Sequence, residues 1–314
     1  MLEIRELTRV YGHFTALDRL SMSIGDGELH GFVGPNGAGK TTTMRILATL
    51  LAPTSGTAVI DGVDVTQNPR RVRELVGYMP DFFGVYDHLK SWEYLDFYAR
   101  CYGFGQSERA RMTAQLLDLV NLSDKKDAYV DSLSRGMKQR LCLAHALIHD
   151  PKLLILDEPA SGMDPRARAE MKGNLKSLKD MGKTVLISSH ILPELSEMCD
   201  SLTIIDHGKL VFSGAVDALA RHMQGQAAIH LRLLPGEDGD PTPAAAALLK
   251  QYPGVTAIER GDDSCTLLVG YEGDEGGMAD LLQALLRAGV RVSGFHRPPM
   301  NLEKVFMEVT RSDS

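Results

Sequence analysis

Short apolar runs alternate with helix-period patterns along the first two thirds of the chain. Apolar strands are predicted at residues 29–33, 152–156 and 184–188, and the spacing of Met44, Leu47 and Leu51 predicts a helix that begins near Lys40. Strands that alternate with helices in this way are typical of a parallel sheet with helices on its faces. The pattern therefore predicts an α/β core.

Two stretches depart from this alternation. Between about residues 91 and 147 the strand-like runs vanish, and Leu116, Leu117 and Val120 recur as one helix face, which predicts a helical subdomain within the core. Near residues 221–227 the pattern lapses into a small polar run. We therefore predict two domains, at residues 1–222 and 223–314.

The second predicted domain has a different pattern. Apolar and polar residues alternate along its strands, and their order with the helices is βαββαβ, which predicts a small α+β domain. Its predicted strands are 229–233, 255–259, 265–269 and 290–295, and its predicted helices are 244–252 and 278–288. A last helix is predicted from a stripe of Leu302, Val305, Phe306 and Val309.

Composition narrows the class of protein. The 314 residues are 44% hydrophobic and 24% charged, as in ordinary globular proteins. With 34 basic and 41 acidic residues the net charge is −7, and no basic run is present, so nucleic acid is not an expected partner. No uninterrupted apolar run is long enough to span a membrane, and the start lacks a secretory pattern. We expect a cytoplasmic chain, and its four scattered cysteines match reduced thiols.

A phosphate-binding loop is the strongest chemical signal. Residues 34–41 read Gly-Pro-Asn-Gly-Ala-Gly-Lys-Thr, which satisfies GxxxxGK[ST] between a predicted strand and a predicted helix. In this motif the backbone N–H groups cradle phosphates, Lys40 reaches the β- and γ-phosphates, and Thr41 offers its hydroxyl to Mg²⁺. The candidate ATP-binding residues here are Gly34, Pro35, Asn36, Gly37, Ala38, Gly39, Lys40, Thr41 and Thr42.

Two acids follow the apolar strand at residues 153–156. Downstream of a phosphate-binding loop, Asp157 is the candidate to hold Mg²⁺ through its water shell. Glu158, one residue further, is the candidate catalytic base that polarises the attacking water.

The motif at residues 133–140, Leu-Ser-Arg-Gly-Met-Lys-Gln-Arg, is similar to the LSGGQ signature of the ATP-binding subunits of ABC transporters. Arg135 and Met137 depart from that signature, whereas Ser134 and Gly136 match it. The resemblance implies that Ser134 and Gly136 bind the γ-phosphate held by a second copy of the chain. Two copies would then enclose two ATP molecules.

Other residues match the same family pattern. Tyr11 matches its adenine-stacking aromatic, and residues 161–164 resemble the D-loop that crosses the dimer interface. His190, which follows Ser188 and Ser189, matches the switch histidine that contacts the γ-phosphate. The resemblance implies a catalytic role for His190 and extends over about residues 2–220 with every motif in family order.

Asp81 departs from the family in a way that bears on the chemistry. Most relatives carry the glutamine of the Q-loop at this position. A carboxylate is an acceptable ligand of Mg²⁺, so Asp81 is a candidate metal ligand beside Thr41 and Asp157. A purely structural role in the turn after Pro80 is equally compatible with the sequence.

The aromatic stretch at residues 82–87 lies where the family docks its membrane partner, although Phe82 and Phe83 could equally belong to the core. The C-terminal domain, ending in a helix at residues 301–306, is similar to the appendage of exporter subunits that serve ABC-2 permeases. The resemblance as a whole implies an ATPase of the P-loop class that dimerises around MgATP. It would act at the inner face of the cell membrane through a separate ABC-2-type permease.

Two alternatives remain. The first is an ABC ATPase that acts on DNA or the ribosome, which the single signature, the absence of a heptad run and the acidic balance disfavour. The second is a nucleotide-gated interaction module with little turnover, which Asp81 and Arg135 motivate. A measurement of steady-state ATPase activity separates this module from the exporter subunit.

Overall fold

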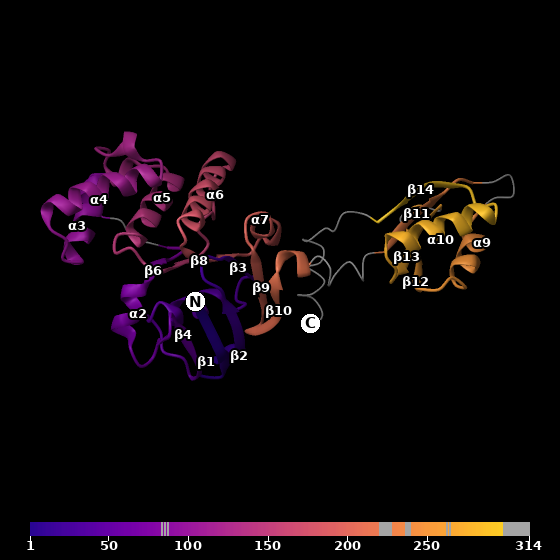
Figure 1. Ribbon diagram of the computed structural model, residues 1–314, viewed down its shortest axis with the longest axis horizontal. Helices are drawn as coiled ribbons and strands as arrows, with labels where there is room; N and C mark the ends of the chain where they lie inside the picture. Colours follow the sequence, from indigo (N-terminus) through magenta and orange to yellow (C-terminus); the bar gives the residue numbers. More distant parts are fainter. Residues whose placement is uncertain are drawn as a thin grey trace. The chain divides into compact units, whose positions relative to one another are not determined.

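The computed structural model describes residues 1–82, 84, 86, 88–219, 228–235, 240–261, 263 and 265–297. Contacts divide the chain into two compact units, the first comprising Met1–Val216 and the second beginning at Asp217. The predicted boundary at 222–223 and the predicted last helix lie outside the described residues. Each unit is described by itself below (Figure 1).

A six-stranded, mostly parallel sheet forms the centre of the first unit. Its order is β10-β9-β3-β8-β7-β6, and only the β9–β10 pair is antiparallel. The strands are β3 (Leu29–Val33), β6 (Val76–Met79), β7 (Leu153–Leu156), β8 (Thr184–Ser189), β9 (Ser201–Asp206) and β10 (Lys209–Ala215). Every residue of β3, β7 and β8 is buried, which explains their continuous apolar runs. The predicted α/β core with a parallel sheet is confirmed.

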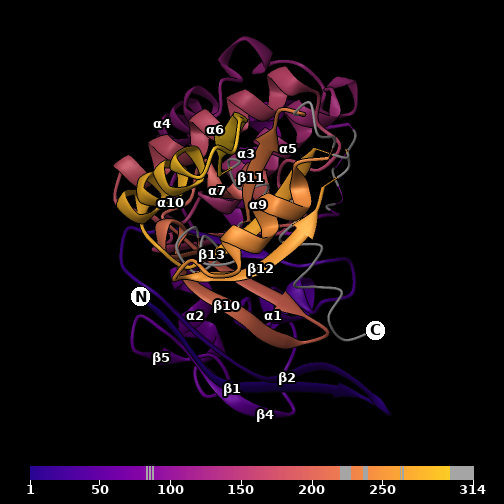
Figure 2. The ribbon, with the colours of Figure 1, turned by 90° about the vertical axis from the view of Figure 1, so that its right-hand side faces the viewer.

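A second, antiparallel sheet was not predicted. Its order is β2-β1-β4-β5, and its strands lie side by side in Figure 2. They are β1 (Leu2–Tyr11), β2 (Phe14–Ile24), β4 (Ser55–Ile60) and β5 (Val63–Asp64). The prediction that strands and helices simply alternate through the first part of the chain is therefore wrong for these residues, because β1 and β2 form a hairpin with no helix between them.

Helices connect the strands of the first unit. Outside the helical segment they are α1 (Lys40–Leu47), α2 (Pro69–Leu75), α6 (Pro165–Asp180) and α7 (Leu192–Ser196). The first helix ends earlier than its apolar spacing predicts, because Thr49 adopts a left-handed backbone with φ 60°. Leu51 therefore lies beyond the helix and packs against the core as part of the following turn.

From residue 88 to β7, where every residue is described, the chain forms a helical segment of three α-helices and two short 3-10 helices. They are α3 (Ser91–Cys101), α4 (Gln106–Leu119), η1 (Ser123–Lys125), η2 (Val130–Ser132) and α5 (Arg135–Ala146). Figure 1 shows α3, α4 and α5 grouped together at one end of the first unit. Leu116, Leu117 and Val120 are all buried, as the helix-face pattern predicts.

Between residues 228 and 297, the described part of the second unit forms a four-stranded antiparallel sheet of order β12-β13-β11-β14 with two α-helices. Its elements are β11 (Ile229–Leu233), α9 (Thr242–Leu249), β12 (Val255–Arg260), β13 (Thr266–Tyr271), α10 (Glu275–Arg287) and β14 (Val292–His296). Alternate residues of β11 and β13 are buried and form one cluster with side chains from both helices. The predicted α+β domain with βαββαβ order is confirmed.

Within the described part of the chain, no helix is both long and apolar enough to cross a membrane.

Candidate nucleotide site

The loop between β3 and α1 forms one wall of a cavity of about 280 Å³. Gly37 and Gly39 have φ angles of 88° and 107°, a left-handed backbone that other residues rarely adopt. A Cβ atom on Gly39 would also lie 2.7 Å from the carbonyl oxygen of Ala16. These glycines therefore allow the loop to curl tightly around the start of α1.

The start of α1 is suited to bind an anion. Its N-cap is Gly39, which provides no side-chain cap, and its first turn contains no acidic residue. The first N–H groups of a helix have no partner within the helix and carry a partial positive charge. This end of α1 can therefore donate backbone hydrogen bonds to a phosphate in the cavity.

Lys40 lies beneath the same loop and is only 6% exposed. Its Nζ donates to the carbonyl oxygens of Gly34, at 2.6 Å, and Pro35, at 3.2 Å. The same nitrogen is 3.6 Å from Oε1 of Glu158. Burial lowers the pKa of Lys40, whereas the carboxylates of Glu158 and Asp157 oppose that shift. A phosphate oxygen can replace the carbonyls as a partner of this ammonium group.

Asp157 follows β7 and is completely buried. Its Oδ1 accepts a hydrogen bond from the Ser188 hydroxyl at 2.6 Å. Its Oδ2 is buried and has no hydrogen-bond partner among the described residues. A buried carboxylate oxygen without a partner is costly unless a ligand satisfies it. This oxygen therefore fits a role in holding Mg²⁺, directly or through water.

Glu158 adopts a left-handed backbone with φ 50°, and its N–H donates to Ser188 Oγ at 2.9 Å. Its two carboxylate oxygens lie 3.2 and 3.1 Å from Nδ1 of His190, which follows β8. The Glu158 side chain is 14% exposed, whereas that of His190 is 46% exposed. The neighbouring strands β7 and β8 thus bring the candidate base and the candidate switch histidine into contact.

The cavity gathers most of the candidate ATP-binding residues. Its lining includes Tyr11, Pro35, Asn36, Gly37, Gly39, Lys40, Thr41, Thr42, Asp81 and Glu158. The Tyr11 ring lies at the rim, is 44% exposed, and has the guanidinium carbon of Arg9 4.6 Å from its centroid. Gly34 and Ala38 belong to the loop without lining the cavity. Asp157 and His190 do not line it either, but Asp157 accepts a hydrogen bond from Ser188, and His190 contacts Glu158, which does line it.

The candidate signature residues lie elsewhere. Ser134 is the N-cap of α5 and accepts a hydrogen bond from the N–H of Met137 at 3.3 Å. A Cβ atom on Gly136 would lie 2.8 Å from Cβ of Ala167, so this glycine allows α5 to approach α6 closely. Neither residue occurs in the described lining of the cavity.

Asp81 does line the cavity. Burial raises the pKa of its carboxyl group, and the negative charge of Asp157 adds to that shift. Arg135 and His190 oppose it. Two side chains that depart from the family pattern, Asp81 and Arg135, therefore influence each other electrostatically.

The aromatic stretch after Asp81 is only partly described. Phe82 is 90% exposed, so the alternative that it belongs to the core is wrong. Phe83 lies outside the described residues.

Three residues of the site were not predicted from the sequence. Phe14 and Ala16, on β2, line the cavity. Ser188 connects the two acids, since it donates to Asp157 and accepts from the N–H of Glu158. The only available signal was the position of Ser188 two residues before His190, because the contact itself depends on the pairing of β7 with β8.

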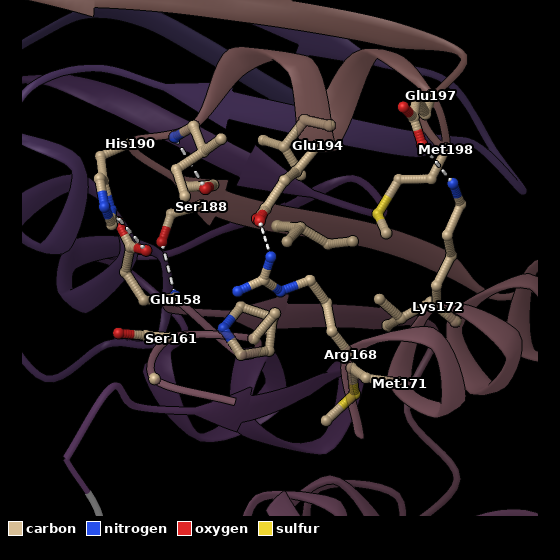
Figure 3. A pocket seen from close by; sticks show the side chains of 18 residues that line it. Glu158, Ser161, Arg168, Met171, Lys172, Ser188, His190, Glu194, Glu197 and Met198 are labelled. Atoms are coloured by element: carbon tan, nitrogen blue, oxygen red, sulfur yellow. Dashed lines mark hydrogen bonds and ion pairs between the residues drawn. The ribbon is translucent and has the colours of Figure 1, made fainter. Parts of the chain in front are cut away.

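A second cavity of about 280 Å³ lies on the other side of Glu158, between α6 and α7 (Figure 3). Its described lining includes the D-loop residues Ser161 and Gly162 as well as His190. Its apolar wall is formed by Met171, Leu175, Ile187, Leu195 and Met198.

Comparison with known proteins agrees with this geometry. A family model described as ABC transporter matches residues 17–161. The daunorubicin/doxorubicin resistance ATP-binding protein DrrA of Streptomyces peucetius is 34% identical over 309 residues, which cover 98% of this chain and 92% of that protein. The Nod factor export ATP-binding protein I of Burkholderia orbicola is 36% identical over 310 residues, covering 98% and 96%.

Solved structures resemble the chain in fold. One ATP-binding subunit of an ABC transporter has a TM-score of 0.64 and 30% identity, covering 71% of this chain and 93% of its own. A dimeric post-hydrolysis form of the ATP-binding cassette MJ0796, bound to ADP and Pi, has a TM-score of 0.63 at 23% identity, covering 69% of this chain and 99% of its own. The chain belongs to the ABC transporter family as an ATP-binding subunit, and it is an ATPase.

Proposed function

We propose that this chain dimerises around two MgATP molecules and powers a separate ABC-2-type permease that exports its cargo. The observation that carries the proposal is the convergence of Lys40, Glu158 and the start of α1 on one cavity, with the unpartnered Oδ2 of Asp157 behind it. These are the groups that phosphoryl transfer to water requires. The site residues named above keep the roles that their motifs predict.

In the proposed mechanism, the N–H groups at the start of α1 and the Lys40 ammonium hold the β- and γ-phosphates. The Glu158 carboxylate orients the attacking water and accepts its proton. His190, whose Nδ1 is 3.1 Å from Glu158, holds that carboxylate and offers its other ring nitrogen to the γ-phosphate. Tyr11 provides the exposed ring on which adenine stacks.

Mg²⁺ fits the oxygen-rich edge of the site. Thr41, Asp157 and Asp81 are the residues that would hold it, and each offers the hard oxygen ligand that this ion prefers. When bound, Mg²⁺ neutralises charge on the phosphates during their transfer.

The homodimer is supported by where the signature residues lie. Ser134 and Gly136 start α5 and do not contribute to the described lining of the cavity of their own chain. If Ser134 binds a γ-phosphate, a second copy must present that phosphate. The solved dimer of MJ0796 has the same fold.

Export is proposed from the relatives. Two proteins named for drug resistance and for Nod factor export align with 98% of this chain, including the second unit. We propose that residues 1–222 are the ATPase domain and that residues 223–314 are an accessory domain. The chain would lie in the cytoplasm, held at the inner face of the cell membrane through the permease, which would dock near the exposed side chains of Phe82 and Tyr86. No nucleic acid is proposed as a partner.

The decisive experiment is the substitution Glu158→Gln in the full chain. It removes the base but keeps the size of the side chain, so we expect ATP binding to persist and steady-state turnover to fall by about 10²-fold or more. A closed dimer should accumulate with ATP. Glu197→Gln, at an exposed glutamate of the same unit, is the matched control and should leave turnover unchanged.

Near-normal turnover of Glu158→Gln would remove Glu158 from the role of base. Negligible turnover of the unsubstituted chain, with or without membranes that contain its permease, would instead favour the nucleotide-gated module.

A further inference from the structure

Two ion pairs join α6 to α7 across the second cavity (Figure 3). Nη1 of Arg168 lies 2.8 Å from Oε1 of Glu194, and Nζ of Lys172 lies 2.9 Å from Oε2 of Glu197. Arg168 and Lys172 are one turn apart on α6, and both glutamates belong to α7 or its C-cap. The two pairs therefore cross the same gap side by side.

Only the first of these pairs reaches the D-loop. Nη2 of Arg168 donates to the carbonyl oxygen of Met163, a D-loop residue, at 3.4 Å. One guanidinium group thus contacts both the segment that follows Glu158 and the helix that begins two residues after His190. Among the described residues, Lys172 and Glu197 pair with each other and form no hydrogen bond to the D-loop.

The apolar side chains between α6 and α7 leave the gap partly open. The cavity of about 280 Å³ remains between side chains such as Met171, Leu175, Leu195 and Met198. Close packing is what resists small displacements of one helix against another, and it is interrupted where this cavity separates α6 from α7. The cavity interrupts the apolar contacts between the two helices, and of the two ion pairs that cross it only Arg168–Glu194 is also connected to the D-loop.

We propose that Arg168 and Glu194 are positioning residues for hydrolysis, which hold the D-loop and His190 at a fixed spacing on either side of Glu158. The inference rests on hydrolysis at Glu158. In the structure, Nδ1 of His190 lies 3.1 Å from Oε2 of Glu158. Without the Arg168–Glu194 pair, α7 can shift into the cavity, and His190 then loses this alignment with the carboxylate. A small misplacement of a catalytic group is enough to reduce the rate substantially. The nucleotide cavity does not include Arg168 or Glu194, so ATP binding should be spared.

The test compares kcat, KM and the midpoint of thermal unfolding in full-length variants. Arg168→Gln and Glu194→Gln should each lower kcat by about 3- to 30-fold while KM for ATP changes by less than about twofold. Because the pair is partly exposed, with side chains 45% and 25% accessible, it adds little to global stability and the midpoint should hardly move. Lys172→Gln is the matched control, because it breaks the neighbouring pair and spares the D-loop contact.

Two further variants separate positioning from a structural role. The kcat of the double variant Arg168→Gln, Glu194→Gln should be no lower than that of Arg168→Gln alone, because both substitutions break the same ion pair. Arg168→Lys keeps the charge facing Glu194 but lacks the forked geometry that also reaches Met163, so its kcat should be intermediate.

Equal effects in Arg168→Gln and Lys172→Gln, additive losses in the double variant, or a parallel loss of kcat, ATP binding and thermal midpoint would each overturn the proposal. Failure of the proposed function would be recognised separately, by normal turnover in Glu158→Gln.

Discussion

The carboxyl group of Asp81 experiences opposing influences at the wall of the nucleotide cavity. Burial and the charge of Asp157 favour its protonated form, and Arg135 and His190 favour its ionised form. A divalent cation held by Asp81 would offset the charge of Asp157 and favour the ionised form of the Asp81 carboxyl group. The two roles proposed for Asp81, metal ligand and turn residue, therefore differ in how strongly the ATPase activity should depend on Mg²⁺.

Asp81→Asn keeps the size of the side chain but removes its charge. If Asp81 is a ligand, this variant should need several-fold more free Mg²⁺ for half-maximal ATPase activity, whereas Asp81→Gln, the common family residue, should be milder. The measurement is the ATPase rate as a function of free Mg²⁺ for the unsubstituted chain and both variants. Superimposable curves would leave Asp81 only its structural role after Pro80.

At the residue scale, the sequence identifies those site residues that belong to a motif of consecutive residues. Lys40 and Glu158 could be selected because each lies in a contiguous motif. Ser188 could not be assigned its role, since its bonds to Asp157 and Glu158 require β7 and β8 to pair in parallel. Phe14 also reaches the cavity from a strand whose position in the sheet was not predicted.

At the scale of elements, buried strands were easier to predict than half-buried ones. The strand β3 is apolar throughout because it lies between β8 and β9, and its predicted bounds are the observed ones. The antiparallel sheet escaped prediction because the pairing of β1 with β2 shifts register three times, which breaks the simple alternation of apolar and polar residues. The pairing of β1 with β4 also joins segments that lie far apart in the sequence, so it cannot be predicted from a local pattern of residues.

The packing of α3 against α5 contains a half-buried histidine, His145. The His145 ring lies 3.9 Å from the Tyr98 ring and 5.8 Å from the Tyr94 ring, measured between centroids. Burial lowers the pKa of His145 to about 4 from 6.5, and the neighbouring His149 adds to this effect. The folded chain therefore resists protonation of His145 over a range of pH in which the unfolded chain accepts it.

This difference makes stability depend on pH with a defined sign. Well above pH 6.5, at about pH 7.5 and higher, His145 is neutral in both states and has no effect. As the pH falls through 6.5 towards 4, the unfolded state gains the proton before the folded state does, so the free energy of unfolding decreases. Between pH 7.5 and 5.5 the expected loss from this residue is about 1 kcal/mol. Urea unfolding of the unsubstituted chain and of His145→Phe, which keeps a ring but cannot titrate, measures it. Equal losses in the two proteins would show that His145 is not responsible.

At the scale of the whole molecule, the proposed mechanism needs residues from two copies of the chain for each nucleotide. The described lining of the nucleotide cavity comes from the first unit and includes Lys40, whereas Ser134 and Gly136 begin a helix that does not line it. The start of α5, like that of α1, has no acidic residue in its first turn and so suits an anion. Two separate phosphate-binding ends in one chain fit a dimer in which each ATP is held by α1 of one copy and α5 of the other.

This arrangement predicts complementation between two defective chains. Lys40→Ala removes the phosphate-binding ammonium group, and Ser134→Arg blocks the start of α5. A mixed dimer of these variants contains one site built from the two intact halves and one site with both defects, so its ATP occupancy should be about half that of the unsubstituted dimer. Dimers purified through two different tags and measured with labelled ATP provide the comparison.

As a control, Lys40→Ala mixed with the double variant Lys40→Ala, Ser134→Arg has no intact site, so its ATP occupancy should remain near that of either parent. If the first mixture also bound no more ATP than either variant alone, Ser134 would act on the nucleotide of its own chain, and the dimer model would be wrong at this point.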